Sequence, residues 1–276
     1  ISMEQSYNLK ITGLETDTDI SYTDIEGKQR TMSYEALLEK FRAQHIEKRK
    51  YLLGTDRAGR DLLSRLLYGT RVSLSIGFMA VLISMVIGFG LGALAGFFGR
   101  WIDSIIMWMM SVVWSIPGIM LVIAISMALQ ARGYWVAFVA VGLTMWVEVA
   151  RIVRGQIMAM REKQFVEAAR AFGVKNFRIV FVHILPNIMG PLIVVATINF
   201  ASAILLEAGL SFLGLSVQPP TPSWGGMIYE GFQAVGTRDS THLILFPSVA
   251  ISIIVLAFNM FGNGLRDAYD PKTQSY

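Results

Sequence analysis

Long uncharged apolar stretches, separated by short polar segments, fill most of this chain. There are five of them, at residues 72–99, 104–131, 133–147, 184–206 and 243–265. A helix needs about 20 apolar residues to cross a bilayer. Four stretches meet that length, and the third approaches it by extending toward Ala150. The pattern predicts an all-α polytopic membrane protein with five spans.

The segments before the first span are polar. Residues 1–50 are mixed in charge, and residues 34–50 have the pattern of a charged helix with one apolar face. From Asp61 to Arg71, leucines recur at helical spacing with arginines between them, which predicts an amphipathic helix lying at a membrane surface. We therefore divide the chain into a segment 1–72 with this interfacial helix, a transmembrane domain 73–265, and a tail 266–276.

A basic insert at residues 151–187 interrupts the apolar sequence. Lys and Arg near span ends are retained inside, so we expect this loop to face the cytoplasm. Gly173 is suited to a left-handed C-cap, Asn176 to the N-cap of a second short helix, and Pro186 to its end. The insert is therefore predicted to form two short helices that dock another protein. Its cations are Arg151, Arg154, Arg161, Lys163, Arg170, Lys175 and Arg178.

The span count conflicts with the charge distribution at first sight. If 151–187 is inside, five spans place residues 1–72 outside, yet 12 of the 24 Lys and Arg precede Val72. Long extracytoplasmic segments cross largely regardless of charge. The chain also begins at Ile1 rather than Met. We therefore expect residues 1–72 to be extracytoplasmic, a further span upstream of Ile1, and a cytoplasmic tail.

Composition narrows the function classes. The chain is 54% hydrophobic and 16% charged, as in multi-span membrane proteins, and its net charge of +4 follows topology rather than nucleic-acid binding. It contains no Cys, its three His residues are scattered, and no G-x-x-x-x-G-K-[ST] sequence occurs. We predict no catalytic, metal or cofactor site in this chain.

Four polar residues fall inside the predicted spans and are candidates for a pathway or gate. Glu148 lies near one span end and could instead pair with Arg151 three residues on. Glu207 lies near the far end of its span, where packing or gate closure is favoured over substrate contact. Asn199 and Asn259 could line a polar path or bond to a neighbouring helix.

Several motifs together resemble the permeases of ABC importers. The pattern Glu167-Ala168-Ala169-x3-Gly173-x9-His183-x-Leu185-Pro186 is similar to their cytoplasmic signature, with His183 as in the peptide branch where the general pattern has an apolar residue. The resemblance covers roughly residues 53–272. Further matching segments are Gly54-Thr55-Asp56-x-x-Gly59-Arg60-Asp61, Ala150-Arg151-Ile152-Val153-Arg154-Gly155-Gln156, Glu207-Ala208-x-Leu210-Ser211-Phe212-Leu213-Gly214, Gln218-Pro219-Pro220, and Gly264-Leu265-Arg266-Asp267.

This resemblance implies a fold, a location and partners. The fold would be the type I importer transmembrane domain, which has six spans, in a bacterial or archaeal cytoplasmic membrane. The partners would be a homologous permease, two subunits that bind ATP and Mg, an extracytoplasmic solute-binding protein and a di- or oligopeptide. The residues implied to form the ATPase-docking coupling helix are Glu167, Ala168, Ala169, Arg170, Gly173, Leu185 and Pro186.

Alternatives remain at this point. Glu167 could be a solvated charge paired with Lys163 or Arg170. The solute could be nickel, glutathione or another small molecule. A secondary transporter driven by an ion gradient would need carboxylates near the membrane midplane, and the positions of Glu148 and Glu207 near span ends argue against it. A scaffold without a transport path is disfavoured by the ordered docking loop.

Three further features have competing interpretations. Gly88, Gly92 and Gly96 allow close helix approach, either as ordinary packing or in contact with the partner permease. Pro117 predicts a kink within the second span. Trp224, in the Pro-rich 216–242 loop, is predicted to anchor at the membrane interface or to help dock the binding protein.

Overall fold

The computed structural model describes residues 19–23, 29–33, 35, 50–131, 133–236 and 241–269. They belong to two units, residues 1–50 and 51–276. In the first unit, β1 (Asp19–Thr23) and β2 (Gln29–Ser33) form an antiparallel hairpin with Asp19 opposite Ser33, which the sequence analysis did not anticipate. The predicted helix over 34–50 lies, except for residues 35 and 50, outside the described residues.

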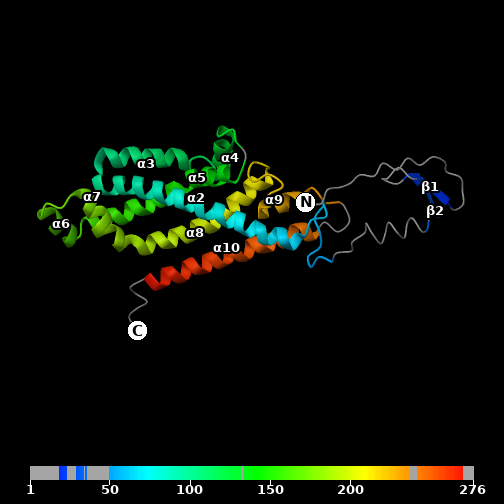
Figure 1. Cartoon of the computed structure of the whole chain (residues 1–276). Coiled ribbons are helices and arrows are strands. Elements are labelled where there is room, and N and C mark those ends of the chain that lie inside the picture. The colour runs from blue at the N-terminus through cyan, green and yellow to red at the C-terminus, as the bar shows by residue number, and fades with distance from the viewer. Residues whose placement is uncertain are drawn as a thin grey trace. The chain divides into compact units, whose positions relative to one another are not determined.

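The second unit is a helical bundle, which confirms the all-α membrane fold. The long helices α2, α5, α8 and α10 run side by side along the bundle (Figure 1). Short helices lie at its two ends, which we call the α6 end and the α9 end. The elements are α2 (Leu62–Phe98), α3 (Arg100–Trp114), α4 (Gly118–Ala128), α5 (Tyr134–Arg161), α6 (Gln164–Ala171), α7 (Asn176–Arg178), the π-helix η1 (Ile179–Ile184), α8 (Leu185–Phe212), α9 (Trp224–Phe232) and α10 (Thr241–Tyr269).

Among the described residues, four helical segments are long and apolar enough to span a membrane. The pair α3 and α4 would make a fifth span, but the two helices meet at 93°. The predicted kink at Pro117 is thus a complete break. Proline disfavours helical geometry at the residue before it and has no N–H to donate. Pro117 itself has an extended ψ of 127° and precedes the first residue of α4.

Two predicted helix boundaries were wrong. The stretch 61–71 is not a separate interfacial helix, because α2 runs without interruption from Leu62 to Phe98. Asp61 starts this helix by accepting hydrogen bonds from the backbone N–H groups of Leu63 and Ser64, at 3.3 and 3.2 Å. Arg65 and Arg71 therefore lie in the same continuous helix as the apolar span. Similarly, α5 continues through the first eleven residues of the predicted loop and ends at Arg161.

The insert also differs from prediction at Pro186. Asn176 is not the predicted N-cap, because Lys175 holds that position without a side-chain cap hydrogen bond and Asn176 is the first helical residue; Pro186 does not end the helix. Residues 176–212 form one continuous helical span with η1 inside it. Proline lacks the N–H that a regular helix would bond to the fourth preceding carbonyl, and a π-turn upstream is one way to accommodate it.

The glycine ladder of α2 packs inside the chain. A Cβ at Gly88 would lie 2.7 Å from the carbonyl oxygen of Trp146, and one at Gly92 would lie 2.5 Å from that of Ala150. Gly96 approaches the Arg154 carbonyl in the same way. These contacts bring α2 directly against α5, so the ladder is an internal packing seam rather than a contact with a partner.

Candidate functional site

Helix α6 is anchored to the bundle by its apolar face. Val166 is fully buried and Ala169 nearly so, within a cluster that includes Phe97 of α2 and Ile157 of α5. Its end at Gly173 has φ +74°, where the N–H of Gly173 bonds to the Arg170 carbonyl and that of Val174 to the Ala169 carbonyl. This pair of hydrogen bonds forms a Schellman cap, which satisfies backbone carbonyls that have no partner within the helix end. The predicted break at Gly173 is confirmed.

The opposite face of α6 is exposed and carries its charges. Glu167, Ala168 and Arg170 are all exposed. Among the described residues no ion pair or hydrogen bond involves the Glu167 carboxylate, so the alternative pairing with Lys163 or Arg170 is not formed. Arg170 instead places its guanidinium 5.1 Å from the centre of the Phe97 ring. Glu167 is available to an external partner.

Leu185 and Pro186 divide between packing and surface. Leu185 is partly buried against the same apolar cluster that holds α6, whereas Pro186 is exposed. Of the seven predicted coupling residues, Ala169 and Leu185 therefore hold the segment in place. The exposed residues are Glu167, Ala168, Arg170, Gly173 and Pro186.

Aromatic side chains surround this charged face, and the sequence analysis missed them. Phe172 is 88% exposed and Phe177 is 72% exposed, while Phe165 is also accessible. Aromatic residues so exposed at a polar helix end are typical of interface cores. Their occurrence within an otherwise polar insert was the available signal. We call Phe165, Glu167, Arg170, Phe172 and Phe177 the α6 surface.

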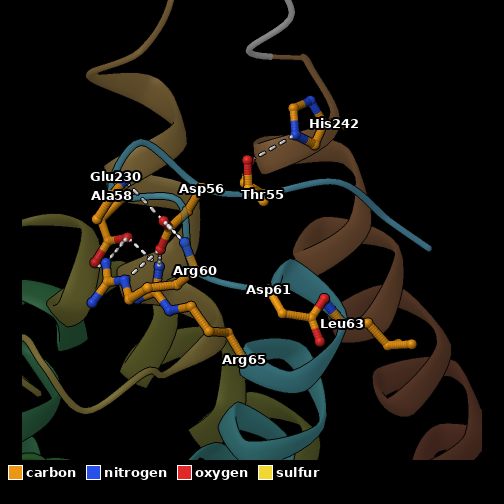
Figure 2. Close-up of polar contacts among 9 residues, drawn as sticks. All are labelled: Thr55, Asp56, Ala58, Arg60, Asp61, Leu63, Arg65, Glu230 and His242. Carbon is orange, nitrogen blue, oxygen red and sulfur yellow. Dashed lines mark hydrogen bonds and ion pairs between the residues drawn. The ribbon is translucent and has the colours of Figure 1, made fainter. Parts of the chain in front are cut away.

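The α9 end is held by a network of ion pairs (Figure 2). Arg65 of α2 donates to Asp56 at 2.5 Å and to both carboxylate oxygens of Glu230 on α9, at 2.5 and 2.9 Å. Arg60 bonds Asp56 at 2.6 Å and reaches Glu230 at 3.4 Å. Bidentate guanidinium–carboxylate pairs of this kind fix both distance and orientation. The network fastens the 51–61 loop and α2 to α9.

Asp56 is the centre of that loop. It also accepts backbone hydrogen bonds from Ala58 and Arg60, both at 2.9 Å, as in an Asx-turn. Burial acts to raise the pKa of Asp56, but the hydrogen bonds from Arg60 and the charge of Arg65 outweigh it, so the pKa lies below its ordinary value. Nearby, a His242 ring nitrogen lies 3.2 Å from the Thr55 carbonyl oxygen, which links the loop to α10.

Glu207 forms a second polar centre, inside the bundle below α9. Its side chain is completely buried, receives a hydrogen bond of 2.7 Å from Ser211, and lies 3.3 Å from the Ser73 hydroxyl of α2. Ser73 also accepts the backbone N–H of Trp224 at 3.2 Å. Glu207 thus connects α2, α8 and the start of α9.

Trp224 is part of this connection rather than an interfacial anchor. It is 3% exposed, and its indole N–H donates to the Leu66 carbonyl at 3.1 Å. The predicted anchoring and docking roles of Trp224 were wrong because α9 folds back onto α2 and α8. The Pro-rich sequence gave no indication of that helix.

The other three pathway candidates occupy different environments. Glu148 is exposed and lies on α5 just before the basic part of that helix, and its predicted pair with Arg151 is not formed among the described residues: the Arg151 guanidinium lies 4.3 Å from the centre of the Trp114 ring. Asn199 is 1% exposed, and its side-chain nitrogen has no partner among the described residues. Asn259 is half-buried on α10 and borders neither of the two larger cavities found in that part of the chain.

Comparison with known proteins adds independent information. The family described as "Binding-protein-dependent transport system inner membrane component" matches residues 88–275. The dipeptide transport system permease protein DppC of Alkalihalophilus pseudofirmus is 43% identical over 82% of this chain and 73% of its own length. The glutathione transport system permease protein GsiD of Pectobacterium atrosepticum is 43% identical over 81% and 73%.

A solved structure supports the fold. The membrane chain of the inward-facing MetNI methionine ABC transporter is similar, with a TM-score of 0.62 and 20% identity, over 75% of this chain and 97% of that chain. At this identity the likeness concerns the fold alone.

Proposed function

Since this chain belongs to the family of binding-protein-dependent transport system inner membrane components, we propose that it forms the pathway for a di- or oligopeptide and couples that pathway to ATP hydrolysis through α6. It is a permease subunit of an ABC importer and a multi-pass protein of the bacterial inner membrane. The proposal concerns its solute and the residues that transmit energy. The α6 surface is the observation that supports it best.

The partners follow from this role. A second permease of similar fold would complete the pathway, and an extracytoplasmic binding protein would deliver the solute. Two ATPase subunits would hold ATP and Mg, and α6 would lie in a cleft of one of them. This chain would perform no hydrolysis itself.

The mechanical link runs through packing. Val166 and Ala169 fix α6 to the ends of α2 and α5, and η1 continues directly into the α8 span. A movement of α6 imposed by the ATPase would therefore be transmitted to three spans as rigid elements. Packed helices switch between discrete arrangements rather than deforming continuously, which suits alternating access.

The solute class rests on the relatives. Both named relatives carry peptidic solutes by their names, dipeptides in one and glutathione in the other, at equal identity. Glutathione is thus the second candidate, and nickel has no comparable support. Family membership also decides against an ion-gradient transporter.

Uptake by the reconstituted complex tests the proposal. Proteoliposomes would contain this chain with its partner permease and ATPase subunits, and the binding protein would be added outside with a labelled dipeptide. We expect uptake that requires enclosed ATP and is competed by other dipeptides. Uptake driven by an imposed ion gradient without ATP, or uptake of glutathione alone, would contradict the respective part of the proposal.

A further inference from the structure

Glu148 is an exposed carboxylate on α5, beside the packing seam between α5 and α2. It lies halfway along the 28-residue helix α5. The neighbouring residues Trp146 and Val149 contact Gly88 of α2, which is well inside the uncharged stretch 72–99. Ionisable residues within membrane spans are rare and face the bundle interior or a water-filled path, where they mark routes for substrates and ions.

The side chain borders a cleft of about 300 Å³. The cleft opens where the second span is broken, so Trp114 and Pro117 form one wall and α5 and α8 form the others. Thr144 and Ser202 contribute hydroxyl groups beside Glu148, and the remaining lining is apolar. Irregular backbone at membrane depth is tolerated where it lines a cavity, as it does here.

The carboxylate of Glu148 has no direct partner within the described part of the chain. No ion pair or hydrogen bond there involves its carboxylate, and the nearest cation in sequence, Arg151, is held above Trp114. An isolated charge in a medium of low dielectric is costly unless it is paired or hydrated. A cationic group entering the cleft would therefore gain an interaction that the empty site lacks.

We propose that this cleft is a transient subsite for the ammonium group of the transported solute, with Glu148 as its counter-charge. The proposal rests on the proposed function, because a peptide with a free amino terminus carries such a group. About 300 Å³ is at the lower limit for ligand pockets, so the cleft suits the amino end of a peptide rather than its whole length. The hydroxyls of Thr144 and Ser202 would accept its remaining hydrogen bonds.

The absence of Cys allows a direct measurement of the charge in this cleft. Ser202→Cys would be introduced into the complete reconstituted complex and labelled with a cationic and an anionic methanethiosulfonate of similar size. We expect the cationic reagent to react roughly tenfold faster relative to the anionic one, and Glu148→Gln to abolish most of this preference. Glu162→Gln, an exposed acid at the end of the same helix, is the matched control and should leave the preference intact.

Peptide protection then tests the ligand. A dipeptide with a free amino terminus should slow labelling of Ser202→Cys, its N-acetylated analogue should not, and Glu148→Gln should remove the difference. Equal labelling rates for the two reagents would overturn the subsite. The proposed function would still stand in that case if the complex showed ATP-driven peptide uptake. Complete shielding of the cysteine by the partner permease alone would also overturn it, since Glu148 would then be an interface residue. Absence of peptide uptake would overturn the proposed function and the subsite with it.

Discussion

The two ends of the bundle use similar residues for opposite purposes. At the α9 end, Asp56, Arg65 and Glu230 satisfy one another within the chain. At the α6 end, Glu167 has no partner among the described residues, and Phe172 and Phe177 are largely exposed. A surface whose charges are paired internally serves the fold. A surface whose charges and aromatics are left open is suited to a second protein.

Charge density alone does not reveal this difference. Both regions are basic in sequence, and both belong to segments that resemble family motifs. What separates the two regions is whether the folded chain pairs their charged side chains with one another. The consequence is testable, because substitutions at the α9 end should affect folding and substitutions at the α6 end should affect assembly.

The largest effect on folding is expected for Arg65→Ala. The Arg65 side chain is buried, and its removal leaves Glu230 with only the 3.4 Å contact to Arg60 and takes one of two arginine partners from Asp56. Breaking a buried pair by removing one member costs about 3–5 kcal/mol, since an uncompensated charge remains. Thermal unfolding in detergent should show a much lower Tm. Arg57→Ala, which removes only an exposed hydrogen bond to the Gln233 carbonyl, is the control and should change the Tm little.

The next effect concerns assembly and uses Glu167→Lys. If Glu167 is desolvated against an ATPase cation, reversing its charge should weaken docking by about 2–5 kcal/mol. Co-purification of the ATPase subunits and substrate-stimulated ATPase activity would both be measured. Glu167 is exposed and unpaired among the described residues. The free energy of unfolding of the isolated chain should therefore stay within about 0.5 kcal/mol of the wild-type value. Normal co-purification by the folded variant would refute the docking role.

The sequence predicted the features that depend on local pattern. Apolar runs located the spans, and Gly173 located the cap of α6, because both follow from short-range physics. Helix ends were predicted less well. The transition at Val72 and the start of the basic loop at Arg151 change polarity without breaking a helix, so α2 and α5 pass through them.

Tertiary pairing was the part that sequence could not supply. Arg65 and Glu230 are separated by 165 positions, and no local pattern relates them. The helix α9 escaped prediction because its residues are stabilised by Ser73 and Leu66 of another helix.

A smaller effect on assembly is expected for Phe172→Ala. Its ring makes little contact within the chain, so the isolated protein should keep its stability. Aromatic residues at the centre of an interface typically contribute more than about 1 kcal/mol to binding, and we expect a loss of about 1–2 kcal/mol in ATPase affinity. Phe78→Ala, which removes an exposed aromatic from α2 within the membrane, is the matched control and should leave ATPase affinity unchanged. Equal losses for both variants would show that the α6 surface has no special role.

The smallest effect is the pH dependence of the α9 end. The pKa of Asp56 is lowered from its ordinary value of 3.8 in the folded chain, against the effect of burial, by the hydrogen bonds of Arg60 and the charge of Arg65. The unfolded chain therefore binds a proton there more readily than the folded chain does. This contribution to stability is fully present above the ordinary value and is lost as pH falls through the lowered folded pKa. Stability should hardly change between pH 7 and pH 5 on this account and decline below about pH 4.

Asp56→Asn has no proton to exchange, so the Tm of this variant should start lower at pH 7 and fall less steeply in acid. Parallel acid profiles for wild type and variant would mean that other carboxylates set the acid limit, and that the network around Asp56 is held by geometry rather than by charge.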